Sequence, residues 1–240
     1  MGERPGTGSD AAAPAAGAAA GGLPLVLPRG RHAAARDVVA SSQRGRLLAA
    51  VATVVAGRGY AATAVADVIA RAGVSRRTFY EHFANKEEAF LAAYDSGVEA
   101  LLAAIDDGIA GAAPDWLAGA EAGTRRYLET LAARPEFART FLVEVLAAGP
   151  RALARRDAVH DRFAANLARL TAAARADLTD LGEPPGHAYA ACVGAVDELV
   201  TRHVREHGAE RLPDLTPVLL DVQLALLVGR EAAAAIRARR

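Results

Sequence analysis

The sequence predicts an all-α protein of about nine helices, and three observations support this prediction. Apolar residues recur at helical spacing, as in the stripe Leu47, Leu48, Val51, Val54 and Val55. No segment stands out with the apolar–polar alternation of a half-buried strand. Glycine and proline divide the chain into segments of helical length.

The order of elements follows from these boundaries. The first 28 residues are dominated by Ala, Gly and Pro, a composition that buries too little apolar surface to offset the entropy of ordering. After this tail, the apolar stripe ends at Gly57 and Gly59. The remaining helices are expected near 64–72, 76–83, 86–111, 115–133, 136–148, 151–179, 187–207 and 214–236.

The run from Ala72 to Glu87 carries the most information. Gly73 follows an apolar-periodic segment, so it suits a helix end that requires a positive φ. Ser75 is a good cap for the next helix, because its hydroxyl can accept a hydrogen bond from a free backbone N–H. Asn85 caps a further helix, and Glu88 stands three residues later, as in a capping box.

The short helix between these caps has two different faces. Phe79 and Phe83 share one face with Val74, whereas Arg76, Arg77, Tyr80 and Glu81 lie on the other. A turn followed by a short basic and aromatic helix is typical of a helix-turn-helix that enters the DNA major groove. By spacing alone, an ordinary helical hairpin with a solvated basic face fits equally well.

A family resemblance favours the first interpretation. The region from about Arg44 to Leu91 resembles the DNA-binding domain of the TetR (tetracycline-repressor, AcrR-like) regulators. The matching elements are Arg58-Gly59-Tyr60, Thr63, Val65, Asp67, Ala72-Gly73-Val74-Ser75, Thr78-Phe79-Tyr80, His82-Phe83 and Asn85-Lys86-Glu87. The resemblance implies a three-helix helix-turn-helix DNA-binding domain over 37–85 and a helical effector-binding and dimerisation domain over 86–240. The composition of residues 1–36 predicts a disordered Ala/Gly/Pro-rich tail with a basic arm.

The predicted DNA contacts lie mainly in this run. Arg76 and Arg77 open the recognition helix, where a side chain can reach a guanine edge or hold a phosphate. Lys86 lies in the first turn of the next helix, where free N–H groups favour an anion. A packed structural role for His82 stays open. Thr63 is expected to cap a helix and is a candidate phosphate ligand. The full predicted set is Thr63, Ser75, Arg76, Arg77, Thr78, Tyr80, His82 and Lys86.

The charge distribution agrees with a DNA-binding N-terminal region. The formal net charge of the 240 residues is zero, but residues 29–86 contain 10 basic and 3 acidic residues, and residues 87–240 contain 17 and 23. A basic N-terminal region followed by an acidic remainder is consistent with DNA binding by the N-terminal region. The basic residues of the segment 29–40 are either a solvated tail or an arm that reaches DNA phosphates or the minor groove.

The resemblance further implies a homodimer on a palindromic operator and a pocket for a small effector of unknown identity. Each of the last two long helices is apolar on more than one side, so its apolar residues can form the core of the chain, the dimer interface, or both. The predicted interface residues are Val193, Val196, Val200, Leu215, Leu219, Val222 and Leu226. For the pocket, the candidates are Trp116, Tyr127, Phe137, Phe141, Glu144, His160, Phe163 and Tyr189, each of which ordinary core packing explains at least as well.

Other classes of function lack a motif. The lone Cys192 excludes an internal disulfide and suits a buried thiol better than a redox sensor. We find no cofactor motif, metal-binding cluster, signal peptide or membrane span, so a cytoplasmic protein that is not an enzyme is expected. The sequence thus favours a DNA-binding repressor released by a small apolar ligand, with a helical adaptor or an enzyme that does not bind DNA as the alternatives.

Overall fold

The computed structural model describes residues 33–112, 115–177 and 182–238. The described residues from Ala40 onward form one compact unit, which is separate from the chain before it. The predicted basic arm therefore lies largely outside the described residues. Its first three basic positions, Arg29, Arg31 and His32, precede them.

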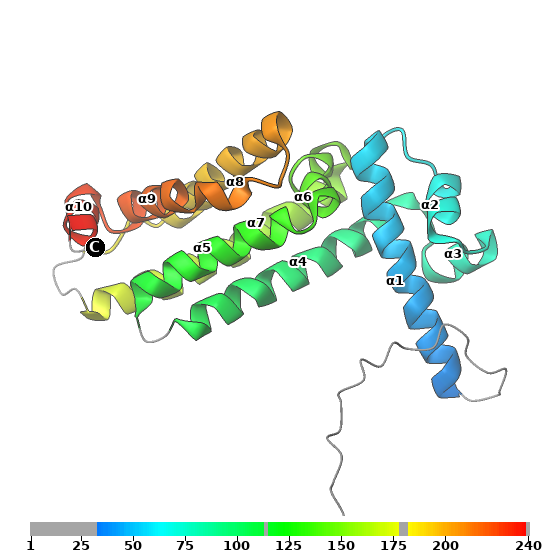
Figure 1. Ribbon diagram of the computed structural model, residues 1–240, viewed down its shortest axis with the longest axis horizontal. Helices are drawn as coiled ribbons and strands as arrows, with labels where there is room; N and C mark the ends of the chain where they lie inside the picture. The colour runs from blue at the N-terminus through cyan, green and yellow to red at the C-terminus, as the bar shows by residue number, and fades with distance from the viewer. Residues whose placement is uncertain (1–32, 113–114, 178–181, 239–240) are drawn as a thin grey trace, which may run out of the picture. The chain divides into compact units, whose positions relative to one another are not determined.

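All regular elements in the described ranges are helices, which confirms the all-α prediction (Figure 1). They are α1 (Ala33–Arg58), α2 (Val65–Ala72), α3 (Arg76–His82), α4 (Lys86–Gly111), α5 (Trp116–Ala132), α6 (Pro135–Leu142), η1 (Glu144–Ala147), α7 (Pro150–Asp177), α8 (Ala188–His207), η2 (Leu212–Leu215), α9 (Thr216–Leu227) and α10 (Arg230–Ala238), where η denotes a 3₁₀ turn.

The described ranges contain ten α-helices, one more than the sequence predicts. The difference arises at Gly229, whose φ of 87° ends α9 and separates it from α10. A glycine adopts this left-handed conformation at little steric cost, so the helix can end there. The apolar pattern of the sequence continues past this break, which is why a single helix was predicted. A second such glycine, Gly149 with φ 97°, separates η1 from α7.

One hydrophobic core joins the helix-turn-helix segment to the rest of residues 40–240. It runs from Leu47 on α1 to Leu219 on α9. Its aromatic part is a series of ring contacts, with 4.9 Å between the ring centres of Tyr60 and Phe90 and 5.2 Å between those of Tyr94 and Phe141. The predicted boundary between residues 85 and 86 crosses this core, so the three domain ranges remain predictions.

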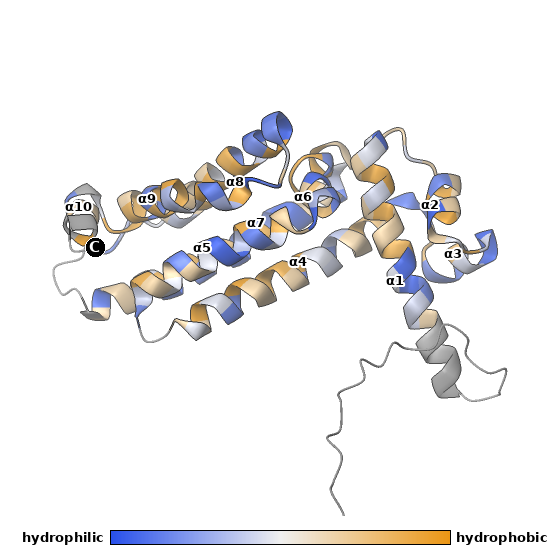
Figure 2. Cartoon of the chain, viewed as in Figure 1, coloured by the Kyte–Doolittle hydropathy of each residue, from blue (hydrophilic) through white to orange (hydrophobic). Residues whose placement is uncertain are grey.

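Helices α4, α5 and α7 run side by side and form the frame of the larger part of the chain (Figure 1). Glycines allow α4 and α5 to approach closely: a Cβ atom on Gly123 would lie 2.9 Å from Cγ1 of Ile109. Helix α8 packs against α7, and α9 packs against α8 and α5. Figure 2 shows hydrophilic residues over α3 and a mostly hydrophobic α9.

Candidate nucleic-acid interface and effector cavity

The turn between α2 and α3 has the geometry that its sequence predicts. Gly73 ends α2 with φ 62° and ψ 42°, and its N–H donates to the carbonyl oxygen of Ile69 at 3.0 Å. Ser75 caps α3 by accepting a 3.0 Å hydrogen bond from the backbone N–H of Thr78. Its hydroxyl also lies 2.9 Å from that of Thr78. These bonds fix the direction in which α3 leaves the turn.

The two faces of α3 separate as expected. Phe79 and Phe83 are buried, with 5.9 Å between their ring centres, so they anchor the helix to the core. On the opposite face the guanidinium of Arg76 lies 5.7 Å from the centre of the Tyr80 ring. Arg77 pairs with Glu81 through a 2.9 Å Nε–Oε1 contact, and its side chain is 89% exposed. Arg76, Arg77 and Tyr80 therefore form one exposed basic and aromatic surface.

Lys86 has a structural partner that the sequence does not reveal. Its Nζ donates a 2.8 Å hydrogen bond to the carbonyl oxygen of Tyr60 and lies 4.3 Å from the centre of that ring. An ammonium group has three donors, so two remain for a phosphate. Asn85 caps α4 as predicted by accepting a 2.9 Å hydrogen bond from the backbone N–H of Glu88. The predicted capping box is incomplete, because the Glu88 carboxylate accepts its 3.1 Å bond from the N–H of Ala84 and not from that of Asn85.

Thr63 does not have the predicted role of a helix cap. Its side chain is buried and donates a 2.8 Å hydrogen bond to the carbonyl oxygen of Gly59. The cap residue of α2 is Ala64, whose N–H is bound by Asp67 at 2.9 Å. The threonine is turned inward because its hydroxyl closes the loop after α1, so it presents no donor to solvent. The half-buried His82 lies beside Phe83, with 6.2 Å between the ring centres.

Arg44 is a further exposed cation near α3, which was not predicted to contact DNA. It lies on α1 and is exposed, and its guanidinium is 5.4 Å from the centre of the Phe83 ring. The sequence shows an excess of arginine in this region but does not indicate that Arg44 lies near α3. Its position next to α3 becomes evident only when α1 and α3 are packed together.

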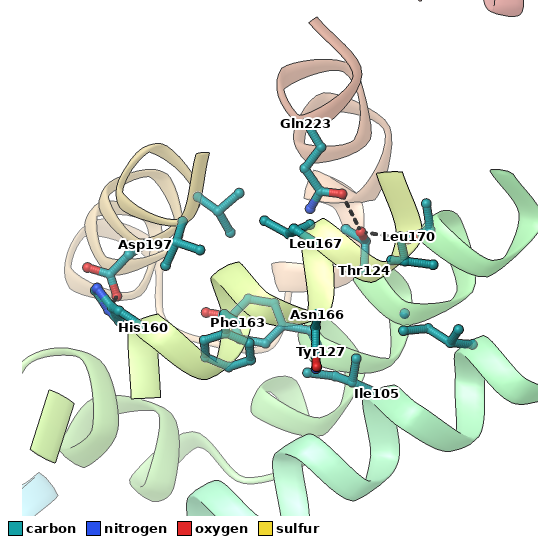
Figure 3. A pocket seen from close by; sticks show the side chains of 15 residues that line it. Ile105, Thr124, Tyr127, His160, Phe163, Asn166, Leu167, Leu170, Asp197 and Gln223 are labelled. Carbon is teal, nitrogen blue, oxygen red and sulfur yellow. Dashed lines mark hydrogen bonds and ion pairs between the residues drawn. The ribbon is translucent and has the colours of Figure 1, made fainter. Parts of the chain in front are cut away.

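A cavity of about 90 Å³ lies among α4, α5, α7, α8 and α9 (Figure 3). Most of its wall is aliphatic or aromatic. The lining residues are Ile105, Ile109, Ala120, Gly123, Thr124, Tyr127, His160, Phe163, Asn166, Leu167, Leu170, Val193, Val196, Asp197 and Gln223.

Polar groups gather at two places in this wall. At one, the carboxylate of Asp197 lies 2.5 Å from Nη2 of Arg156 and 3.5 Å from Nε2 of His160. Burial raises the pKa of Asp197, but His160 and Arg156 outweigh it and hold the pKa below its ordinary value. At the other, Thr124 donates to Oε1 of Gln223 at 3.2 Å.

Only three of the eight predicted pocket residues line this cavity, namely Tyr127, His160 and Phe163. Trp116 lines a smaller neighbouring cavity of about 30 Å³ among α5, α7 and α9. Tyr189 packs near the buried Cys192 instead. Phe137 and Phe141 belong to the aromatic core.

Glu144 also lies elsewhere. Its carboxylate accepts a 2.9 Å hydrogen bond from the backbone N–H of Tyr60, in the loop after α1. The prediction selected large aromatic residues, whereas the wall consists mainly of aliphatic and small residues. Thr124, Asn166 and Gln223 line the cavity without a signal in the sequence, because they face it only through the packing of α5, α7 and α9.

The predicted dimer residues divide by burial. Val193, Val200 and Leu219 are buried within the single chain, and Val196, Leu215 and Val222 are partly buried. Leu226 is 43% exposed. Two neighbours in the same pair of helices, Leu199 on α8 and Val218 on α9, are 37% and 51% exposed. The exposed apolar residues of α8 and α9 are thus Leu199, Val218 and Leu226; together with the partly buried Val222 they are called the outward apolar face, and the buried residues belong to the core.

Within the described residues, no group of three or more His, Cys, Asp or Glu side chains could hold a metal ion. None of the helices they form is both long and apolar enough to span a bilayer.

These features define a helix-turn-helix protein with a helical body that contains a cavity. Residues 47–93 match the sequence family described as bacterial regulatory proteins of the tetR family. Over 72 residues the chain is 35% identical to the HTH-type transcriptional activator FasR of Mycolicibacterium smegmatis, a match that covers 30% of this chain and 33% of FasR. The chain thus spans about a third of the length of this curated relative. The segment 47–93 thus belongs to the tetR family.

Solved structures share the fold of the whole body. The fatty acid degradation regulator FadR of Bacillus halodurans superposes with a TM-score of 0.68 at 21% identity, over 77% of this chain and 94% of that one. FadR of Bacillus subtilis, solved in complex with stearoyl-CoA, has a TM-score of 0.65 at 18% identity, over 77% and 98%. At these identities the likeness establishes the fold.

Proposed function

We propose that this protein is a homodimeric transcription regulator that binds a palindromic DNA site and changes its DNA affinity when a small apolar molecule enters the cavity. The surface of α3 is the observation that carries the proposal. Its start is fixed by Gly73 and Ser75, its inner face is anchored by Phe79 and Phe83, and its outer face presents Arg76, Arg77 and Tyr80. The N-terminal residues of such a helix are those that reach base edges.

The charge around this surface supports the same proposal. Arg44 on α1 lies against Phe83, directly after α3, and Lys86 is the first residue of α4, so cations from α1, α3 and α4 are available to neutralise phosphates. A single short helix reads few base pairs, and a two-fold dimer would double the site. The outward apolar face of α8 and α9 is the surface that would form it, and the protein would act in the cytoplasm, where bacterial DNA lies.

We infer release from DNA, hence repression, as the direction of the response. The cavity lies against α4, whose first residue, Lys86, contacts the loop after α1. A ligand that binds one arrangement of α4 more tightly than another shifts the population toward it. FasR is named as an activator, so the sign of regulation is a separate measurement from DNA binding.

The test is titration of the protein with a fluorescent fragment of its own promoter and with a shuffled fragment, at several salt concentrations. Binding should favour the promoter, and the log–log slope against salt should be about −0.9 per phosphate neutralised. Arg76→Ala should weaken promoter binding. Arg125→Ala on α5 removes an equal charge far along the chain and should leave it unchanged. Equal, salt-insensitive binding to both fragments would refute the proposal.

A further inference from the structure

We infer that the cavity takes a compact, uncharged molecule with a carbonyl or hydroxyl oxygen at one end, which Tyr127 binds through its hydroxyl group. This inference rests on the proposed function, because the molecule that it describes is the effector of that function. Three observations carry it: the partnerless Tyr127 hydroxyl, the charges already paired beside it, and the size of the cavity.

The hydroxyl of Tyr127 is the first observation. This side chain is 9% exposed, lines the cavity, and makes no hydrogen bond to any residue that the structure describes. Figure 3 shows the ring of Tyr127 within the group of lining side chains, beside Phe163. The hydroxyl is not among the fully buried polar atoms without a partner, so it keeps accessible surface at which a ligand can reach it. A ligand oxygen that accepts a hydrogen bond from it gains about 0.5–1.5 kcal/mol.

The charges of the wall are the second observation. None of the 15 lining residues is Lys or Arg, so no lining cation awaits a carboxylate or phosphate. The one lining carboxylate, that of Asp197, is held by Arg156 and His160. A cationic ligand would compete with Arg156, and an anionic one would be repelled by Asp197. A charge left unpaired in such a site is costly, which favours an uncharged ligand.

The cavity size is the third observation. An engineered apolar cavity of about 150 Å³ holds a benzene ring, and this cavity measures about 90 Å³. A ring or a short branched chain fits with small movements of the lining side chains. Long acyl chains would need the helices to separate. The side chains of Ile109, Leu167 and Leu170 provide the apolar contact for the body of the ligand.

The experiment compares four probes with one carbon ring: cyclopentanone, methylcyclopentane, cyclopentylammonium and cyclopentanecarboxylate. Their dissociation constants are measured by NMR titration of the full chain without DNA. Cyclopentanone should bind most tightly. In Tyr127→Phe its dissociation constant should rise by about three- to tenfold, while that of methylcyclopentane stays unchanged. Tyr189→Phe, which removes a hydroxyl outside the cavity, should change neither.

Several results would overturn the inference. They are tighter binding of either charged probe, equal effects of Tyr127→Phe on the ketone and the hydrocarbon, or no binding of any probe to the folded chain. Stearoyl-CoA serves as a further probe, because a structural neighbour was solved with it. Binding of stearoyl-CoA that is tighter than that of cyclopentanone and insensitive to Tyr127→Phe would also overturn it. Since no DNA is present, failure here is distinct from failure of the promoter titration.

Discussion

The backbone N–H of Tyr60 donates a 2.9 Å hydrogen bond to Oε2 of Glu144, a residue 84 positions later in the chain. The carbonyl oxygen of the same tyrosine accepts a 2.8 Å bond from Nζ of Lys86. Tyr60 is thus held at both backbone groups, once from η1 and once from the start of α4. These bonds fix the loop after α1 to the helices that continue toward the cavity.

Removing the Glu144 acceptor should destabilise the chain. Glu144 is 8% exposed, so Glu144→Ala leaves the Tyr60 N–H buried without a partner, at a cost of about 1–3 kcal/mol. Glu144→Gln keeps an acceptor oxygen and should cost less. Urea unfolding measures both, with the exposed Glu136→Ala as the control. Equal stability of Glu144→Ala and the control would show that this bond is unimportant.

Mutations in α3 should distinguish contacts with particular bases from contacts with the DNA backbone. Arg77→Ala should relax the preference for one or two base pairs by about 1–3 kcal/mol if its guanidinium reads a guanine. Tyr80→Phe removes only a hydroxyl and should weaken all sequences alike. Competition titrations with single-base variants of the promoter site measure the difference. If Arg77→Ala weakens every sequence equally, Arg77 contacts phosphate alone.

Glu81 gives an independent check of the same surface. It pairs with the exposed Arg77 and carries a charge that DNA repels. Glu81→Gln should therefore raise affinity for random DNA and make the salt dependence steeper. Lys86→Ala tests a phosphate contact less directly, because it also removes the hydrogen bond from Lys86 to the Tyr60 carbonyl oxygen.

The sequence predicts local geometry well and tertiary contacts poorly. The caps at Ser75 and Asn85 and the left-handed Gly73 depend on neighbours within a few residues, so their chemistry is readable from the chain. The cavity wall is different, because Thr124 and Gln223 meet only when α5 and α9 pack together. The role of Glu144 is hidden for the same reason, since its partner lies 84 residues away.

Dimerisation should depend on the exposed apolar residues and not on the buried ones. Val218→Arg or Leu226→Arg places a charge on the outward apolar face, so the chain should remain folded and become monomeric. Leu219→Arg lies beside Val218 but points into the core, so it should unfold the chain instead. Light scattering and circular dichroism together distinguish the two outcomes. A folded dimer with Val218→Arg and Leu226→Arg combined would place the interface elsewhere.

Cys192 should be unreactive in the native protein. It is fully buried on α8, and burial raises the pKa of its thiol to about 12, so almost no thiolate exists near pH 8. Because the thiolate is the reactive form, modification by a disulfide reagent should require unfolding. The rate with and without urea checks this. Rapid reaction in buffer alone would reveal frequent opening of the helices around Cys192.

Replacing glycine with alanine should destabilise the chain at Gly97 on α4 and stabilise it at Gly45 on α1. A Cβ atom on Gly97 would overlap the ring of the buried Phe137, so Gly97→Ala should cost about 1–3 kcal/mol through overpacking. Gly45 on α1 has no atom within 4 Å of such a Cβ, and Gly45→Ala should stabilise the helix by about 0.5–1 kcal/mol. The same substitution thus has opposite signs at the two sites, which urea unfolding resolves. Combining Gly97→Ala with Phe137→Leu should recover part of the loss, because a smaller side chain leaves room for the new methyl group. A loss with Gly97→Ala that Phe137→Leu does not reduce would mean that a contact other than this ring is responsible.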